Sequence, residues 1–113
     1  MSQFMLFIRN GDEPNELSPE QIQQAIQRFS AWARKLREQG KLIAAEKLKD
    51  NEGLMLNARN GQIVVDGPFA ETKETIGGYF IIEAGNLEEA IELTKECPAL
   101  SQGGKVELRE VEG

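Results

Sequence analysis

The chain has 113 residues, which suits one domain with a single hydrophobic core. Its formal charge of −6 argues against nucleic acid or an anionic membrane as the main partner, because both attract basic surfaces. It has no histidine and only one cysteine, which excludes an internal disulfide, zinc sites, histidine acid–base chemistry and Ser-His or Cys-His machinery. With no membrane-length apolar run and no signal-peptide pattern, we expect residues 1–113 to form one cytoplasmic domain.

A strand and a long helix are predicted first. The apolar run QFMLFIR, residues 3–9, is typical of a strand. Ser18 begins a helix and forms a capping box with Gln21, and Gly40 ends the helix as a left-handed cap. Spacing by three and four positions predicts one apolar stripe along this helix: Ile22, Ala25, Ile26, Phe29, Trp32, Ala33 and Leu36.

Three strands are predicted next, at residues 41–48, 53–59 and 62–66. The dipeptide Asn60-Gly61 separates the last two. Because both residues tolerate positive φ, this dipeptide predicts a tight type I′ hairpin turn.

The carboxyl-terminal part predicts a strand, a helix and a strand. GGYFIIEA, residues 77–84, is followed by Asn86, which caps a helix over residues 87–97 that ends at Pro98. The last strand is KVELREV, residues 105–111. The order β-α-β, hairpin, β-α-β predicts an α+β fold of the ferredoxin-like, split β-α-β class, with two helices on one face of an antiparallel sheet.

Both faces of the predicted sheet carry apolar side chains. Phe4 and Leu6 point to one side of the first strand while Met5 and Phe7 point to the other. Two helices cover only one side, so the second side needs another cover, and a second copy of the sheet is the simplest one. We therefore predict a homodimer whose sheets pack face to face around a partly apolar cavity.

Two carboxylates interrupt the apolar faces. Glu46 is expected to share a face with Leu42, Ala44 and Leu48, and Glu83 to share one with Tyr79 and Ile81. Each has two interpretations: a side chain that reaches solvent at a strand end, or a pocket carboxylate whose pKa is raised by burial and suits proton transfer.

The segment between the fourth and fifth predicted strands is too long for an ordinary hairpin turn. Asp66 begins it, the proline that follows Gly67 excludes a two-residue turn, and Phe69 is expected to anchor it into the core. Gly77-Gly78 allow a sharp re-entry or a bulge. Glu71 and Lys73 belong to an outward charged run, which either grips a polar ligand or is a solvated surface.

The sequence VVDGPFAETKETIGGYFIIEA, together with the capped helix after it and GKVELREV, closely resembles the YCII-related superfamily, and specifically the branch named for the motif Asp-Gly-Pro-Phe at residues 66–69. The similarity runs through nearly the whole chain. It implies a bacterial protein, a dimeric α+β barrel with a pocket between sheet and loop, and an association with sigma-factor-like regulators. For most members it implies no established activity.

The wider superfamily is proposed to use a His-Asp pair, which this chain cannot provide because it lacks histidine. Chemistry would then fall to Asp66, Glu71, Lys73 and Tyr79 as catalytic candidates. Candidate ligand-binding residues are Phe69, Arg59, Arg109, Glu46 and Glu83. The two arginines are anion clamps if they face the cleft, and strand-surface charges otherwise.

Three functions remain open. The first is a small-molecule binder or enzyme with proton-transfer, lyase- or isomerase-like chemistry on a polar organic molecule, and we expect no cofactor. The second is a non-catalytic dimeric module that binds a regulatory protein. The third is a cation site at Asp12, Glu13 and Glu16, although no recognised calcium-loop spacing is present. Trp32 is predicted to be a core residue, and Cys97 a small, partly buried one.

Overall fold

The computed structural model describes residues 1–9, 18–49, 53–66, 76–101 and 103–113. Four strands form one antiparallel sheet: β1 (Ser2–Arg9), β2 (Leu42–Lys47), β5 (Ile76–Ala84) and β6 (Lys105–Glu110). Their order is β2-β5-β1-β6, with the two most apolar strands, β1 and β5, side by side in the centre. This strand order and the helices on one face confirm the predicted ferredoxin-like α+β class.

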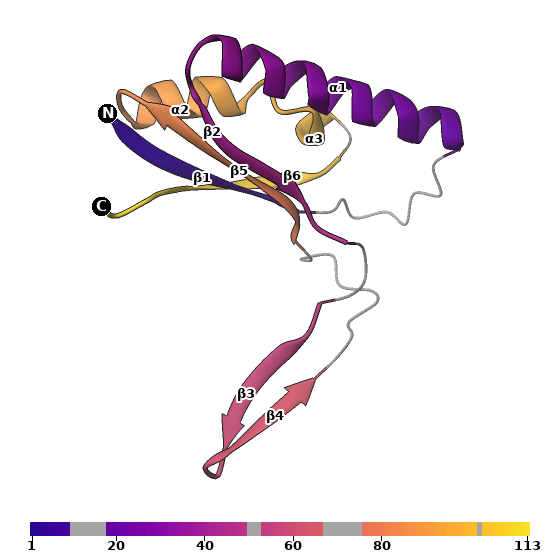
Figure 1. Cartoon of the computed structure of the whole chain (residues 1–113), viewed down its shortest axis with the longest axis vertical. Coiled ribbons are helices and arrows are strands. Elements are labelled where there is room, and N and C mark those ends of the chain that lie inside the picture. Colours follow the sequence, from indigo (N-terminus) through magenta and orange to yellow (C-terminus); the bar gives the residue numbers. More distant parts are fainter. Residues whose placement is uncertain (10–17, 50–52, 67–75, 102) are drawn as a thin grey trace.

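The helices lie together over one face of this sheet (Figure 1). Helix α1 (Pro19–Glu38) is followed later by α2 (Leu87–Thr94) and the short α3 (Pro98–Ser101). The capping box is confirmed, because the Ser18 hydroxyl accepts from the Gln21 amide at 3.1 Å and the Gln21 side chain accepts from the Ser18 amide at 2.9 Å. These bonds satisfy two of the amides that a helix start leaves free.

The ends of the helices are set by local geometry. Gly40 has a φ of +70° directly after Gln39, the C-cap residue of α1, as the left-handed cap requires. Asn86 caps α2 by accepting from the Glu89 amide at 2.8 Å. The second helix is shorter than predicted and ends at Thr94. Beyond it, the amides of Glu96 and Cys97 donate to carbonyls three residues back instead of four, as in a 3₁₀ turn. Pro98 begins α3 instead of ending α2.

The core fills the space between the sheet and the helices. Phe4, Leu6 and Ile82 are 0% exposed, and Trp32 packs at a tilt against Phe80 with ring centroids 4.6 Å apart. Each such side chain contributes about 1.5–3 kcal/mol by leaving water. Trp32 is buried, as predicted, and Cys97 is buried more fully than the partial burial predicted for it.

Only the second half of the α1 stripe is buried. Leu36 and Trp32 are covered by the sheet, whereas Ile22 and Ile26 are exposed. Periodicity therefore identified the apolar face of the helix, but it could not give the length over which the sheet covers that face.

Two bulges adjust the sheet. One follows Leu42, so that Leu42 pairs with Ile82 and Ala44 pairs with Ile81, leaving Ile43 as the extra residue. The predicted face of Glu46 was therefore wrong in part: Leu42 packs on the core side, and Glu46 lies on the opposite side. The predicted bulge at Gly77-Gly78 is confirmed by a register shift opposite Ile8 and Arg9.

A separate hairpin comprises β3 (Met55–Arg59) and β4 (Gln62–Asp66). Asn60 and Gly61 have φ of 51° and 79°, so the predicted tight turn is confirmed. Figure 1 shows this hairpin extending away from the sheet on the side opposite to the helices. Within the described ranges, β3 and β4 contact chiefly each other.

Candidate functional site

The face of the sheet that no helix covers is the candidate site, and we call it the open face. Its centre consists of Met5 and Phe7 from β1 and Tyr79 and Ile81 from β5. These side chains alternate with the buried Phe4, Leu6, Phe80 and Ile82, so they point away from the helices. All four are half-buried by their neighbours in the sheet.

The strand register arranges the open face in rows across the sheet. One row is Glu46, Tyr79, Phe7 and Glu107, and the next row is Ala44, Ile81, Met5 and Arg109. Residues opposite each other in antiparallel strands have Cβ atoms about 4.5–5.5 Å apart. The phenol of Tyr79 therefore lies between the carboxylate of Glu46 on one edge strand and the ring of Phe7.

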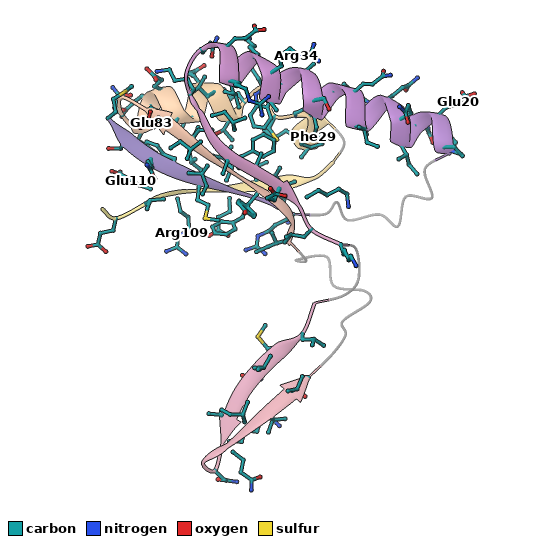
Figure 2. The ribbon with its side chains drawn as sticks, viewed as in Figure 1. Glu20, Phe29, Arg34, Glu83, Arg109 and Glu110 are labelled. Atoms are coloured by element: carbon teal, nitrogen blue, oxygen red, sulfur yellow. The ribbon has the colours of Figure 1, made fainter. Side chains whose placement is uncertain are left out.

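The opposite edge of the open face carries both signs of charge. Arg9 donates to the Oε1 atom of Glu107 at 2.8 Å, and Arg109 lies 3.8 Å from the other carboxylate oxygen of Glu107. Figure 2 shows Arg109 on the side of the sheet away from the helices, while Phe29 lies between α1 and the sheet. Both guanidinium groups therefore lie beside the Glu107 carboxylate, and that of Arg109 is largely exposed.

Glu83 also points to the open face. It pairs with Gln3 of β1, two positions beyond the Ile81–Met5 pair, and it is half-buried. The sheet thus brings together four of the predicted site residues: Glu46, Tyr79, Glu83 and Arg109. Two neighbours, Arg9 and Glu107, were not predicted. The two-residue alternation with Phe7 and Arg109 could have identified both, because strand residues two apart share a face.

Two predicted residues lie on the hairpin instead. Arg59 and Asp66 approach each other at 3.7 Å, and Asp66 also accepts from the Asn57 amide group at 3.4 Å. Such an exposed ion pair contributes little stability. The structure therefore places these two side chains together, apart from the residues of the open face.

Three predicted residues, Phe69, Glu71 and Lys73, lie outside the described residues. The same holds for the cation candidates Asp12, Glu13 and Glu16. In the part of the chain that the structure describes, no group of three or more acidic or cysteine side chains is placed to hold a metal ion. None of the helices in the described ranges has the length and apolar character needed to cross a membrane.

A shallow groove of about 350 Å³ lies on the other side of the molecule, between α1 and the connection from α2 to α3. It contains none of the predicted site residues. Lys95 in its wall pairs with Glu92 at 2.9 Å, and Glu96 pairs with Lys35 at 2.7 Å. Burial raises the pKa of the Cys97 thiol, which keeps it protonated and unreactive at neutral pH. We therefore place the candidate site on the open face and not in this groove.

The arrangement of the open face suits a ligand with an apolar part and polar ends. Carboxylates from Glu46 and Glu83 and the phenol of Tyr79 are acid–base groups around an apolar centre, and Arg109 provides a positive charge at the edge. One open sheet face encloses nothing, however, so a cleft needs a second wall.

Comparison with known proteins identifies the relatives of the chain. The model of the YCII-related domain matches residues 3–112. An uncharacterised protein of Rhizobium meliloti is 33% identical over 95 residues, which cover 81% of this chain and 77% of that protein.

Proposed function

The chain belongs to the YCII-related domain family, and from its open face we propose that it works as a homodimer that binds a small polar organic molecule between sheet and loop. The observation that carries this proposal is the open face itself. It carries the half-buried Met5, Phe7, Tyr79 and Ile81 on the side that the described helices do not cover. A contiguous apolar patch of this kind is typical of an interaction site.

A second copy packed on the open face would supply the missing wall of the cleft. Two stacked sheets lie about 10 Å apart, which leaves room for side chains and a small ligand between them. The segment that begins at Asp66 and contains Phe69, Glu71 and Lys73 completes the cleft in this proposal. The Asp-Gly-Pro-Phe branch of the family is part of the same proposal.

The residues have different roles in this proposal. Arg109 holds an anionic group of the ligand, because a guanidinium matches a carboxylate or phosphate with two donors. Tyr79 donates from its phenol, and Glu46 and Glu83 accept. Proton transfer between a bound carbon acid and one of these carboxylates, with Asp66, Glu71 and Lys73 as further candidates, gives lyase- or isomerase-like chemistry.

The experiment is native mass spectrometry of the purified protein, followed by release of bound molecules under denaturing conditions. We expect a dimer that carries an additional small-molecule mass. The variant Tyr79→Phe removes one hydroxyl from the open face and should lower the occupancy of that mass at least about tenfold, as expected when a buried polar group of the ligand loses its partner. The control, Glu92→Gln, changes an exposed side chain on α2 and should retain full occupancy.

Other outcomes contradict the proposal in distinct ways. A monomer at micromolar concentration overturns the homodimer and the cleft together. A dimer that carries no bound mass, and that stays dimeric as Tyr79→Phe, contradicts the ligand part of the proposal. It supports the alternative, a non-catalytic dimeric module associated with a transcriptional regulator.

A further inference from the structure

The hairpin β3–β4 has two different faces. Cross-strand pairs Leu56–Val65 and Ala58–Ile63 share one face, which is apolar. Leu56, Val65 and Ile63 are 59%, 56% and 67% exposed. The opposite face carries Met55 and Val64 together with Asn57, Arg59 and Asp66, and the side chains of the last three interact. The hairpin therefore has one wholly apolar face, which is exposed in the described chain, and one face that mixes polar and apolar side chains.

Such a hairpin gains little stability by itself. An isolated two-stranded hairpin is marginally stable at best in water. The Asn60-Gly61 turn sets its register, but the favourable free energy of an apolar face comes only when that face leaves water. Leu56, Ile63 and Val65 thus require a cover that the described residues of the same chain do not give.

The position of the hairpin points to its cover. It extends from the side of the sheet that carries the open face (Figure 1). A second copy packed on the open face, as in the proposed homodimer, therefore lies beside the hairpin. Stacked sheets are about 10 Å apart and five strand residues span about 17 Å, so the hairpin is long enough to pass the edge of the partner sheet.

The neutral charge of the hairpin is compatible with a second copy of the chain as its cover. The whole chain carries a formal charge of −6, so two copies repel each other over most of their surface. Residues 53–66 carry one arginine and one aspartate, which cancel. The hairpin thus brings apolar surface to an acidic partner without adding negative charge, and it offers no charge that would select a strongly basic or acidic protein.

From these observations we infer that β3–β4 is an exchanged arm. Its apolar face, formed by Leu56, Ala58, Ile63 and Val65, packs on the body of the second copy. In a two-fold dimer each copy donates one arm and receives one, so both apolar faces are covered at once. This inference rests on the proposed homodimer, and it assigns to the hairpin the task of holding the two copies together.

The test compares three glutamate substitutions by sedimentation velocity over nanomolar to micromolar concentrations. Ile63→Glu places a negative charge on the apolar face of the arm, whereas Gln62→Glu places the same charge on the other face of the same strand. Phe7→Glu places it on the open face. We expect Ile63→Glu to raise the dimer dissociation constant at least about 30-fold, as loss of a central interface side chain does. Gln62→Glu should stay within about threefold of the wild type.

A second measurement covers the case in which Ile63→Glu merely unfolds the hairpin. Hydrogen exchange of the wild-type hairpin amides, at residues 55–59 and 62–66, should be slow in the dimer. It should become fast in the Phe7→Glu monomer, because the arm has then lost its cover. Fast exchange of these amides in an intact wild-type dimer overturns the inference that the hairpin is an exchanged arm.

The outcomes separate the arm from the dimer it rests on. If Phe7→Glu dissociates the protein and Ile63→Glu does not, the arm is overturned and the face-to-face dimer stands. If Ile63→Glu dissociates it and Phe7→Glu does not, the arm stands and the face-to-face packing falls. A wild-type monomer at micromolar concentration overturns both.

Discussion

The four-stranded sheet and the hairpin β3–β4 are both antiparallel and both alternate in sequence, yet they differ in what they bury. Leu6 in β1 is 0% exposed, whereas Leu56 in β3 is 59% exposed. The difference is the second layer: α1 and α2 cover one face of the sheet (Figure 1), and no described element covers the hairpin. Apolar alternation therefore makes a core only where another layer lies against it.

This difference divides the molecule into two kinds of structure. The body, formed by the sheet and helices, has its own core around Phe4, Phe80 and Trp32. The hairpin depends on a surface outside the described chain. The free energy of unfolding of the monomer should therefore depend on side chains in the body and not on those of the apolar face of the hairpin.

The largest expected effect is the contrast between Leu6→Ala and Leu56→Ala. Leu6→Ala leaves a cavity in the core and should lower the free energy of unfolding by about 2–5 kcal/mol. Leu56→Ala removes the same atoms from an exposed position and should change it by less than about 0.5 kcal/mol in the monomer. Urea denaturation checks both, in the monomeric Phe7→Glu background.

Equal losses for the two variants in the monomer would break the comparison, because Leu56 would then have a cover within its own chain. In the dimer, by contrast, Leu56→Ala should weaken association, since the arm loses part of its contact with the partner.

Gly78 gives the next largest effect, within the body. A Cβ atom at this position would lie 2.9 Å from the backbone oxygen of Glu46 in the neighbouring strand. Backbone cannot move aside without disturbing the β2–β5 ladder, so Gly78→Ala should cost about 1–3 kcal/mol. Gly53, just before the hairpin, has no atom within 4 Å of such a Cβ. Gly53→Ala should be neutral or stabilising by up to about 1 kcal/mol. Urea denaturation in the same monomeric background measures both changes. Equal losses in the free energy of unfolding for the two alanine variants would contradict this prediction.

Local features of the structure followed from the sequence, and features set by distant contacts did not. The caps at Ser18 and Asn86 and the turn at Asn60-Gly61 depend on a few neighbouring residues, so the residue types alone predicted them. The bulge after Leu42 depends on how β2 meets β5, and nothing in the local pattern indicates it.

The same distinction applies to the candidate site. Alternation placed Tyr79 and Glu83 on one face of β5, because a strand has a fixed period of two. The ion pair between Arg9 and Glu107 joins residues far apart in the chain and required the β1–β6 register. The pair of Arg59 with Asp66 likewise depends on the register of the hairpin. The rows of side chains across a sheet therefore depend on strand register as well as on sequence.

The smallest expected effect is a pH dependence confined to the body. Lys41 donates to the Glu89 carboxylate at 2.7 Å, and this bond, together with one from the Gly85 amide, lowers the pKa of Glu89 from its usual value. A lowered pKa in the folded state means that this pair stabilises the protein above the unfolded pKa of Glu89. The contribution is lost as the pH falls through the folded pKa. Because the pair links the start of β2 to α2, its loss weakens the body and leaves the hairpin unaffected.

Glu89→Gln should therefore be slightly less stable than the wild type at neutral pH and equal to it in acid. Urea denaturation from neutral pH to about pH 3 checks this, again in the monomeric background. Glu92→Gln is the matched control, since Glu92 on the same helix pairs with Lys95 where both side chains are largely exposed. A stability difference between wild type and Glu89→Gln that persists unchanged at low pH would contradict the ion pair as its source. It would point instead to the uncharged hydrogen bonds at the start of α2.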